Sequence, residues 1–364
     1  MPDQPILRPL DLGDLRLPNR VVMAPVTRAR ATDGGLVPTA LHTAYYAQRA
    51  GAGLIVTEGT WVGEDAVGFT GVPGIFTEDQ VTGWRRVTDV VHTLGGRIVL
   101  QLWHTGAASH PDHLGGRTPA GPSAIDPREQ SFTPGGFKPT VTPRAMTPAD
   151  IAATVADYRR AAENARRAGF DGVEIQAVGS FLIPQFLNPL LNHRTDTYGT
   201  DRHRLLLDIV DAVAEGAGFR DGGVVGVRLS PYWRSGERFL ADDDTLADFD
   251  TLVERLDDHP VTYLHLRGRD LTPPDANDFA RYRKRFRGPL IVNNGFDLAS
   301  ANTAVTTATA DAVSFGTAFI SNPDLVTRFA LGHPLTAADP ATYYTGGAAG
   351  YVDYPAGGWP GGVG

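Results

Sequence analysis

The sequence of 364 residues predicts an α/β fold in which eight parallel strands alternate with helices and close into a (β/α)8 barrel, the TIM barrel. Eight short runs rich in β-branched residues recur along the chain and are apolar on both faces, as a covered parallel sheet requires. Stretches with helical periodicity separate these runs. A doubly wound sheet would also alternate, but the GxGxxG pattern of a dinucleotide-binding fold does not follow the first run.

The expected strands are bounded by turn residues and separated by segments that can carry a right-handed crossover. They are Val21–Val26, Gly53–Glu58, Arg97–Trp103, Gly172–Val178, Val224–Ser230, Thr262–Arg267, Pro289–Asn293 and Asp311–Phe315.

The clearest helix begins after Thr147, which can cap it, with Pro148 in its first turn, and runs to Ala168, where Gly169 stops it. Four other helices are expected on the same grounds. They are Glu78–Leu94, Arg202–Ala214, Asp243–Leu256 and Asp324–Ala330.

Two segments fall outside the repeat, within what we interpret as a single domain over residues 1–364. Leu10 to Leu17 resembles a short hairpin that would close the bottom of the barrel. Residues 104–147 are rich in Gly and Pro and follow the third strand, so they are expected to form a lid over the carboxyl ends of the strands, where barrel active sites are built. Residues 357–364 are expected to be a loose tail.

Composition excludes several classes of protein. Lys plus Arg number 33 against 41 for Asp plus Glu, a net charge of −8, which argues against binding to nucleic acid or to an anionic membrane. Cysteine is absent, which excludes disulfides and thiolate metal sites. No signal peptide or membrane-spanning run is visible, so a soluble cytoplasmic protein is expected. One basic cluster, Arg281 to Arg287, is interpreted as a solvated helix face.

Polar groups stand where the expected strands end, and they would therefore meet at one mouth. Thr27, Gln101 and Arg228 follow or end the first, third and fifth strands, and glycines follow the seventh and eighth. This set suits a flat heterocycle with imide edges and a phosphate, since an amide pairs with an imide and glycines let backbone N–H groups approach phosphate oxygens. Arg228 and Gln101 are interpreted as functional because neither has an evident structural partner. His104, His110 and His113 lack a carboxylate at metal-ligand spacing, so no metal is expected.

Eight segments, in this order, resemble those of the Old Yellow Enzyme family, ene-reductases that carry FMN in a (β/α)8 barrel. The resemblance covers residues from about 5 to 355. The segments are MAPVTRARA, YYAQRAGAGLIVTEGT, GVPGIFTEDQVTGW, LQLWHTGAASHP, RTDTYG, VGVRLSP, AFISNPDL and GYVDYP.

The resemblance implies FMN as the cofactor and assigns roles to individual positions. Thr27 would lie near the flavin N5, Gln101 at the pyrimidine edge, and Arg228 beside N1 and the C2 oxygen. Seven implied residues would border the ring or the phosphate, and four would line the substrate pocket. The first set is Ala24, Pro25, Gly59, Asn294, Gly295, Gly316 and Thr317, and the second is Phe69, Trp103, His104 and Tyr351.

The family pattern breaks at the positions that would act on a substrate. Gln176 and Gly179 replace the His and the Asn or His that would hold a carbonyl oxygen, and Phe181 replaces the Tyr that would donate a proton. Losing an oxyanion donor typically slows a reaction by about a hundred- to thousandfold, and losing a placed acid by about a hundred- to ten-thousandfold. Thr317 replaces an Arg against the flavin phosphate. The pair at 176 and 179 would also hold nicotinamide, so the use of NAD(P)H as reductant stays open.

These departures favour a flavoenzyme of specialised biosynthetic metabolism that moves hydride to or from a bulky apolar substrate. Two alternatives stay open: a non-redox enzyme that catalyses cyclisation or isomerisation, with or without flavin, and an ordinary ene-reductase whose site has drifted. A third and less favoured alternative is a protein that binds a small molecule without catalysing a reaction. The expected partner is a small molecule, and the expected state is a monomer or homodimer. Arg234 and Arg238 are interpreted as solvated loop cations, with contact to an anionic substrate as the alternative.

Overall fold

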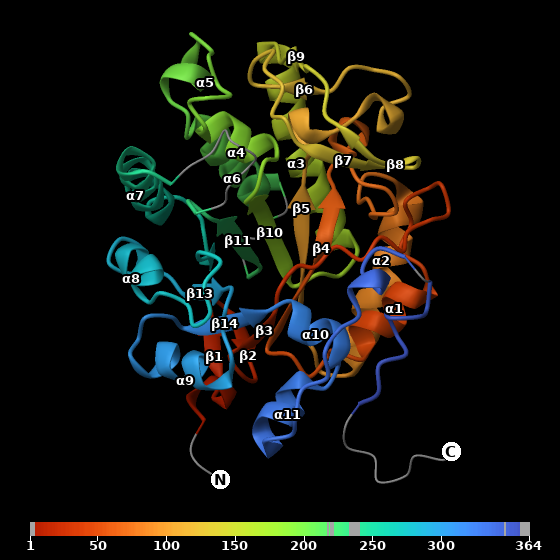
Figure 1. Ribbon diagram of the computed structural model, residues 1–364, viewed down its shortest axis with the longest axis vertical. Coiled ribbons are helices and arrows are strands. Elements are labelled where there is room, and N and C mark those ends of the chain that lie inside the picture. Colours follow the sequence, from red (N-terminus) through yellow and green to blue (C-terminus); the bar gives the residue numbers. More distant parts are fainter. Residues whose placement is uncertain (1–3, 217, 219–221, 233–240, 346, 357–364) are drawn as a thin grey trace.

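The computed structural model describes residues 4–216, 218, 222–232, 241–345 and 347–356. Its eight parallel strands close into a barrel in chain order, with β14 pairing to β3, which confirms the predicted fold (Figure 1). The barrel strands are β3 (Val21–Met23), β4 (Leu54–Trp61), β5 (Ile98–Trp103), β10 (Gly172–Ala177), β11 (Val224–Leu229), β12 (Tyr263–Arg267), β13 (Leu290–Asn293) and β14 (Ala312–Phe315).

Two strands differ from the expected bounds by more than one residue, for local reasons. β3 ends at Met23, because Pro25 lacks the N–H that would extend the parallel ladder. β4 runs on to Trp61, with a register shift between Val56 and Gly59 against β5. This irregularity places Gly59 opposite Gln101 at the mouth of the barrel.

The five predicted helices form close to their expected ends. Thr147 caps α3 by accepting a hydrogen bond from the Asp150 backbone N–H, and Gly169 follows the helix with a φ of 85°. These helices are α2 (Glu78–Thr93), α3 (Pro148–Arg167), α6 (Arg204–Gly216), α7 (Asp243–Asp257) and α11 (Leu325–Leu331). α8 (Asn277–Arg283) begins before the basic cluster that the sequence placed on a helix and includes its first residues. Within the described residues, five further short helices were not predicted: α1 (Ala40–Ala47), α4 (Leu182–Leu187), α5 (Thr197–Thr200), α9 (Leu298–Thr306) and α10 (Thr317–Ser321).

The N-terminal hairpin closes the end of the barrel opposite the site. β1 (Leu10–Leu12) pairs antiparallel with β2 (Leu15–Leu17). Leu12 and Leu17 are fully buried and pack against the first inward-facing layer of the barrel, which includes Val22, Leu54 and Val224. This confirms the predicted cap and leaves the carboxyl ends of the strands as the open mouth.

The insertion after β5 carries its own small strands beside that mouth. β7 (Gln130–Thr133) and β8 (Gly136–Pro139) form an antiparallel hairpin, and β6 (Ala120–Gly121) pairs with β9 (Arg144–Ala145). Phe132 of β7 bridges to Phe69 in the loop after β4, so the insertion contacts the loops that surround the mouth.

The basic cluster at the end of α8 packs against acidic residues of α7. Arg281 and Arg285 both pair with Asp250, at 2.6 and 2.8 Å, and Arg287 pairs with Asp257 at 2.5 Å. The cluster therefore joins two neighbouring helices rather than forming a purely solvated face. No helix in the described ranges is long and apolar enough to cross a membrane. The tail at 357–364, Arg234 and Arg238 lie outside the described residues.

Candidate active site

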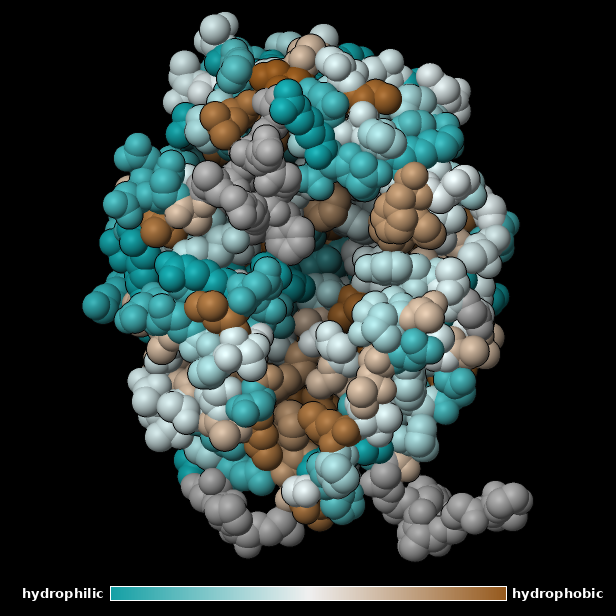
Figure 2. Space-filling model, viewed as in Figure 1, coloured by the Kyte–Doolittle hydropathy of each residue, from teal (hydrophilic) through white to brown (hydrophobic). Residues whose placement is uncertain are grey.

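A cavity of about 260 Å³ lies at the carboxyl ends of the strands and is lined by residues of five strands and of the loops that follow them. Figure 2 shows the surface hollowed near its centre, where β4, β5, β10 and β11 end in Figure 1. We call this space the strand-end cavity. Its lining residues are Pro25, Thr27, Gly59, Phe69, Gln101, Trp103, Gln176, Val178, Gly179, Phe181, Arg228, Arg267 and Tyr344.

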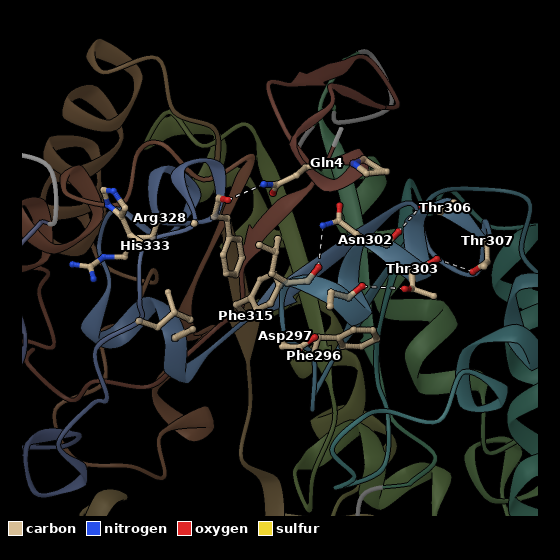
Figure 3. A pocket seen from close by; sticks show the side chains of 17 residues that line it. Gln4, Phe296, Asp297, Asn302, Thr303, Thr306, Thr307, Phe315, Arg328 and His333 are labelled. Atoms are coloured by element: carbon tan, nitrogen blue, oxygen red, sulfur yellow. Dashed lines mark hydrogen bonds between the residues drawn. The ribbon is translucent and has the colours of Figure 1, made fainter. Parts of the chain in front are cut away.

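A larger cavity of about 890 Å³ lies outside the barrel, between α9 and α11 (Figure 3). Phe296, Phe315 and Phe329 contribute to its apolar wall. It contains none of the residues that the sequence singles out. In barrel enzymes the chemistry is built at the strand ends, so the smaller strand-end cavity is the better candidate for the active site.

A buried polar network forms the floor beneath the strand-end cavity. Gln101 donates from Nε2 to Glu174 Oε1 at 2.7 Å, and Glu174 Oε2 lies 2.8 Å from His265 Nδ1. Tyr263 donates its hydroxyl to the same Oε2 at 3.0 Å, and His265 Nε2 lies 2.7 Å from Ser314 Oγ. The network fixes the Gln101 amide, whose oxygen is then the acceptor available to a donor in the cavity.

The charges of this network are set by burial and by each other. Burial alone would raise the pKa of Glu174, but His265, Arg228 and Gln101 together outweigh it and the pKa is lowered. Burial also lowers the pKa of His265, against the opposing effect of Glu174. At neutral pH the floor therefore holds a carboxylate and a neutral imidazole.

Arg228 enters the cavity from β11 above this carboxylate. Its guanidinium donates to Asn293 Oδ1 at 2.9 Å, and its electrostatic counterpart is Glu174. Burial lowers its pKa to about 10, which Glu174 opposes. Arg228 therefore has structural partners that the sequence did not reveal, although it also lines the cavity.

Two buried polar atoms at neighbouring positions of the cavity have no hydrogen-bond partner. Gln176 and Arg228 face each other in the register of β10 and β11. Gln176 donates from Nε2 to the Val178 carbonyl at 2.6 Å, and its Oε1 is left unpartnered, as is Arg228 Nε. Unsatisfied buried polar atoms are costly, so an acceptor and a donor on paired residues of one cavity favour a polar ligand there.

Aromatic side chains form the walls. Trp103 stacks on Trp61 with ring centroids 4.4 Å apart, and Phe181 meets Trp103 edge-on at 4.8 Å. Phe69 lies 5.2 Å from Tyr344. No side chain at 176, 179 or 181 supplies an imidazole or a phenol, so the polar trio typical of the resembled family is missing from this wall.

The C-terminal segment that carries Tyr344 is held in place by two buried arginines. Arg28 donates to the Gly350 carbonyl at 2.6 Å, and Arg30 donates to the Tyr343 carbonyl at 2.7 Å and the Thr342 carbonyl at 2.8 Å. Both arginines follow Thr27, so the chain on one side of the cavity positions Tyr344.

Seven residues that the sequence proposed for the site do not line the cavity. His104 is buried, and its Nδ1 accepts the Gly106 N–H at 3.0 Å, which holds the turn after β5. Tyr351 is buried and stacks on Tyr45 at 4.1 Å, so its placement on the substrate wall is corrected to packing. The remaining five lie near the strand ends but outside the lining: Ala24, Asn294, Gly295, Gly316 and Thr317.

The sequence analysis missed Glu174, His265, Arg267 and Tyr344. The first three could have been found, because polar residues repeat at every second position on otherwise apolar strands. Glu174 precedes Gln176 by two, and His265 precedes Arg267 by two, so each pair points to the same face of its strand. Tyr344 lies far along the chain and carries no such pattern.

A buried acid on β4 and a buried base on α1 should make opposite contributions to the pH dependence of stability. Glu58 Oε1 lies 3.7 Å from His42 Nε2, and neither atom has a hydrogen-bond partner. Burial raises the pKa of Glu58 from 4.5 to about 7 and lowers the pKa of His42 from 6.5 to about 4. Between pH 4.5 and 6.5 the folded protein keeps a proton on Glu58 that the unfolded chain loses, so this group makes stability fall as pH rises. His42 acts in the opposite sense, because the unfolded chain holds the extra proton.

We therefore expect the two contributions to offset each other in the native protein. His42→Gln should make the free energy of unfolding fall by about 2 kcal/mol as pH rises through this window, and Glu58→Gln should make it rise by a similar amount. Urea unfolding of both variants at several pH values within the window measures the slopes. If the free energy of unfolding changes with pH in the same direction in both variants, the pKa values of Glu58 and His42 are not shifted in opposite directions.

The barrel brings an amide, a guanidinium and a hydroxyl to one mouth, in the place where barrel enzymes build their active sites. The family model described as the NADH:flavin oxidoreductase / NADH oxidase family matches residues 5–336. The chain belongs to this family, that of Old Yellow Enzyme, whose members are FMN-dependent oxidoreductases.

Individual relatives match along nearly the whole chain. Flavin oxidoreductase hxnT of Emericella nidulans is 38% identical over 386 residues, which cover 97% of this chain and 98% of that protein. A probable flavin mononucleotide-dependent alkene reductase of Leishmania infantum is also 38% identical, with 96% and 97% covered. The solved structure of morphinone reductase in complex with tetrahydroNAD is 42% identical, with a TM-score of 0.89 and coverage of 97% and 98%.

Proposed function

We propose that this chain binds FMN in the strand-end cavity and moves hydride to or from a bulky, largely apolar small molecule of specialised biosynthetic metabolism. The unpartnered donor of Arg228, together with the Gln101 amide that Glu174 holds in place, carries the proposal. A ring edge with both a donor and an acceptor would pair with these two groups, and the flavin pyrimidine has such an edge.

The residues present fit the flavin at its ring edge. The Gln101 amide, fixed by Glu174, would pair with the pyrimidine edge, and the Arg228 guanidinium would stabilise negative charge there. Thr27, which also lines the cavity, would donate a hydrogen bond near N5. When bound, FMN supplies the chemistry of hydride transfer.

The phosphate would rest near the ends of β13 and β14. Gly295 and Gly316 would offer backbone N–H groups there, with Asn294 alongside, and the exposed Thr317 hydroxyl could donate a further hydrogen bond. Gly295 has a φ of 77°, and a Cβ there would lie 1.9 Å from the Leu271 carbonyl oxygen, so this position requires glycine in any case.

The walls determine which substrates suit the cavity. Trp103, Phe181 and Phe69 present aromatic surface, and the side chains at 176, 179 and 181 offer no acid to protonate a substrate carbon. A substrate that is oxidised releases hydride and needs no such acid. Oxidation, or reduction with a proton taken from elsewhere, is therefore the chemistry that this wall supports best.

We propose NAD(P)H as the reductant where the enzyme works reductively. The similarity to morphinone reductase, solved with tetrahydroNAD, supports this proposal. The side chains at 176 and 179 offer no imidazole to hold a nicotinamide, so we expect slow hydride transfer from NAD(P)H to the flavin.

Two measurements test the proposal. The purified protein, supplied with FMN and desalted, should retain the flavin absorption band. Stopped-flow mixing with NADH and with NADPH should then bleach this band slowly. A colourless protein without affinity for FMN would overturn the proposal in favour of non-redox chemistry on the barrel, and rapid bleaching would overturn the predicted loss of the nicotinamide anchor.

A further inference from the structure

The side chains that line the strand-end cavity include two cations. Two guanidinium groups, those of Arg228 and Arg267, line it, and none of its described lining residues is a carboxylate. The two arginines differ in their surroundings, because Arg228 has the buried carboxylate of Glu174 beneath it. Arg267 lies further towards the mouth.

The strand register shows the relative height of the two arginines. Arg228 stands opposite His265 in the parallel pairing of β11 and β12. Arg267 is two residues beyond His265, so it faces the same side of the sheet one pleat nearer the mouth. Arg228 therefore belongs to the floor of the cavity, and Arg267 to the level above it.

Arg267 has the carboxylate of an exposed residue among its contacts. Its guanidinium lies 2.6 Å from Asp270 Oδ1, and Asn294 Nδ2 donates to the same oxygen at 2.9 Å. The Asp270 side chain is 79% exposed, whereas that of Arg267 is 15% exposed. Ion pairs with an exposed partner contribute little to stability, so a better shielded carboxylate can compete for this position.

Flat apolar surface faces this cation across the same cavity. Trp103 and Phe181 meet edge-on, and Tyr344 and Phe69 pack on the other wall. Aromatic rings bind well to such surfaces, by offset stacking or edge-to-face contact. A molecule that combines a planar ring with a carboxylate would use both features of the cavity.

We propose that Arg267 is a specificity-determining residue that selects an aryl or aryl-alkenyl carboxylate as the substrate of this cavity. The substrate carboxylate replaces Asp270 on the Arg267 guanidinium, while its ring packs against Trp103 and Phe181. The inference rests on the proposed function, because it names the substrate class of the same site and leaves Arg228 to the flavin.

The test compares acids with their uncharged counterparts. Cinnamate, benzoate and phenylacetate are each titrated against the corresponding primary amide. The flavin band of the FMN-loaded protein and the tryptophan fluorescence of the protein without added FMN both report binding. At least one acid should bind about tenfold more tightly than its amide, equivalent to about 1.4 kcal/mol.

Three variants test whether the Arg267 guanidinium causes the preference for the acid over the amide. Arg267→Met should abolish the preference and leave amide binding within about twofold, since it removes one charge-assisted contact. Asp270→Asn should tighten acid binding severalfold without changing amide binding, because it removes the competing carboxylate. Arg287→Met, which removes one positive charge far from the cavity, should leave the preference intact.

Several outcomes overturn the proposal. One is a wild-type protein that binds none of the acids more tightly than its amide, and another is a preference that survives in Arg267→Met. If Arg267→Met does not fold, unchanged acid affinity in Asp270→Asn overturns it. If the protein prefers the acids but does not bind FMN, only the proposed function is overturned. If it binds FMN but shows no preference for the acids, only the role of Arg267 is overturned.

Discussion

Restoring three polar side chains to the cavity wall should raise the rate at which the FMN-loaded protein reduces cyclohexenone by at least about a thousandfold. The variant combines Gln176→His, Gly179→Asn and Phe181→Tyr. The first two changes supply donors for the substrate oxygen, on which negative charge develops, and the third supplies an acid for the substrate carbon. Each effect alone is worth about a hundredfold or more, and together they are not expected to multiply fully.

The backbone can accept these three side chains. Gly179 has a φ of 86°, and asparagine tolerates this left-handed conformation better than most residues. Gln176 already fills its position with a side chain that lines the cavity. Phe181 caps the start of α4 without a side-chain hydrogen bond, so a tyrosine there breaks no existing contact of that kind.

The effect is measured in two ways: by steady-state rates with saturating reductant, and by single-turnover oxidation of the reduced flavin by cyclohexenone. Phe181→Tyr alone is the matched control, and it should gain far less because nothing polarises the carbonyl. If the triple variant keeps its flavin and gains no activity, positions 176, 179 and 181 do not hold the substrate in this chain.

The strands were predictable because a strand buried on both faces is apolar along most of its length. Eight β-branched runs gave eight strands, and Thr147 and Gly169 marked both ends of α3. The short helices α4, α5 and α10 were missed. Each has six residues or fewer, too short for an apolar period of 3.6 to become visible.

The candidate site was predictable where strand ends alone determine which residues meet. Four predicted residues lie on or just after four different strands and line one cavity for that reason: Thr27, Gln101, Gln176 and Arg228. The partner of Arg228 was not predictable, because Glu174 lies 54 positions earlier in the chain and only barrel closure brings them together. Tyr344 reaches the cavity through bonds from Arg28 and Arg30 to backbone carbonyls, which leave no side-chain pattern to read.

Removing the buried carboxylate beneath the strand-end cavity should destabilise the protein by about 3 kcal/mol. In Glu174→Gln, Arg228 would lose its buried counter-charge, while the Asn293 contact at 2.9 Å remains. A guanidinium buried without a carboxylate is costly, because burial already lowers the pKa of Arg228 to about 10 in the presence of Glu174. Urea unfolding of the protein without added FMN measures the loss.

A double-mutant cycle separates the electrostatic coupling of Glu174 and Arg228 from the packing of each side chain. Arg228→Met alone should also destabilise the protein, since it leaves the Glu174 carboxylate without its cation, although His265 and Tyr263 still contact that carboxylate. The double variant Glu174→Gln with Arg228→Met leaves no charge unpaired, so its loss should fall well short of the sum of the two single losses. Losses that add to within about 0.5 kcal/mol would show that the two groups are not coupled. The floor would then be held by hydrogen bonds alone, and the charge of Arg228 would be available entirely to its ligand.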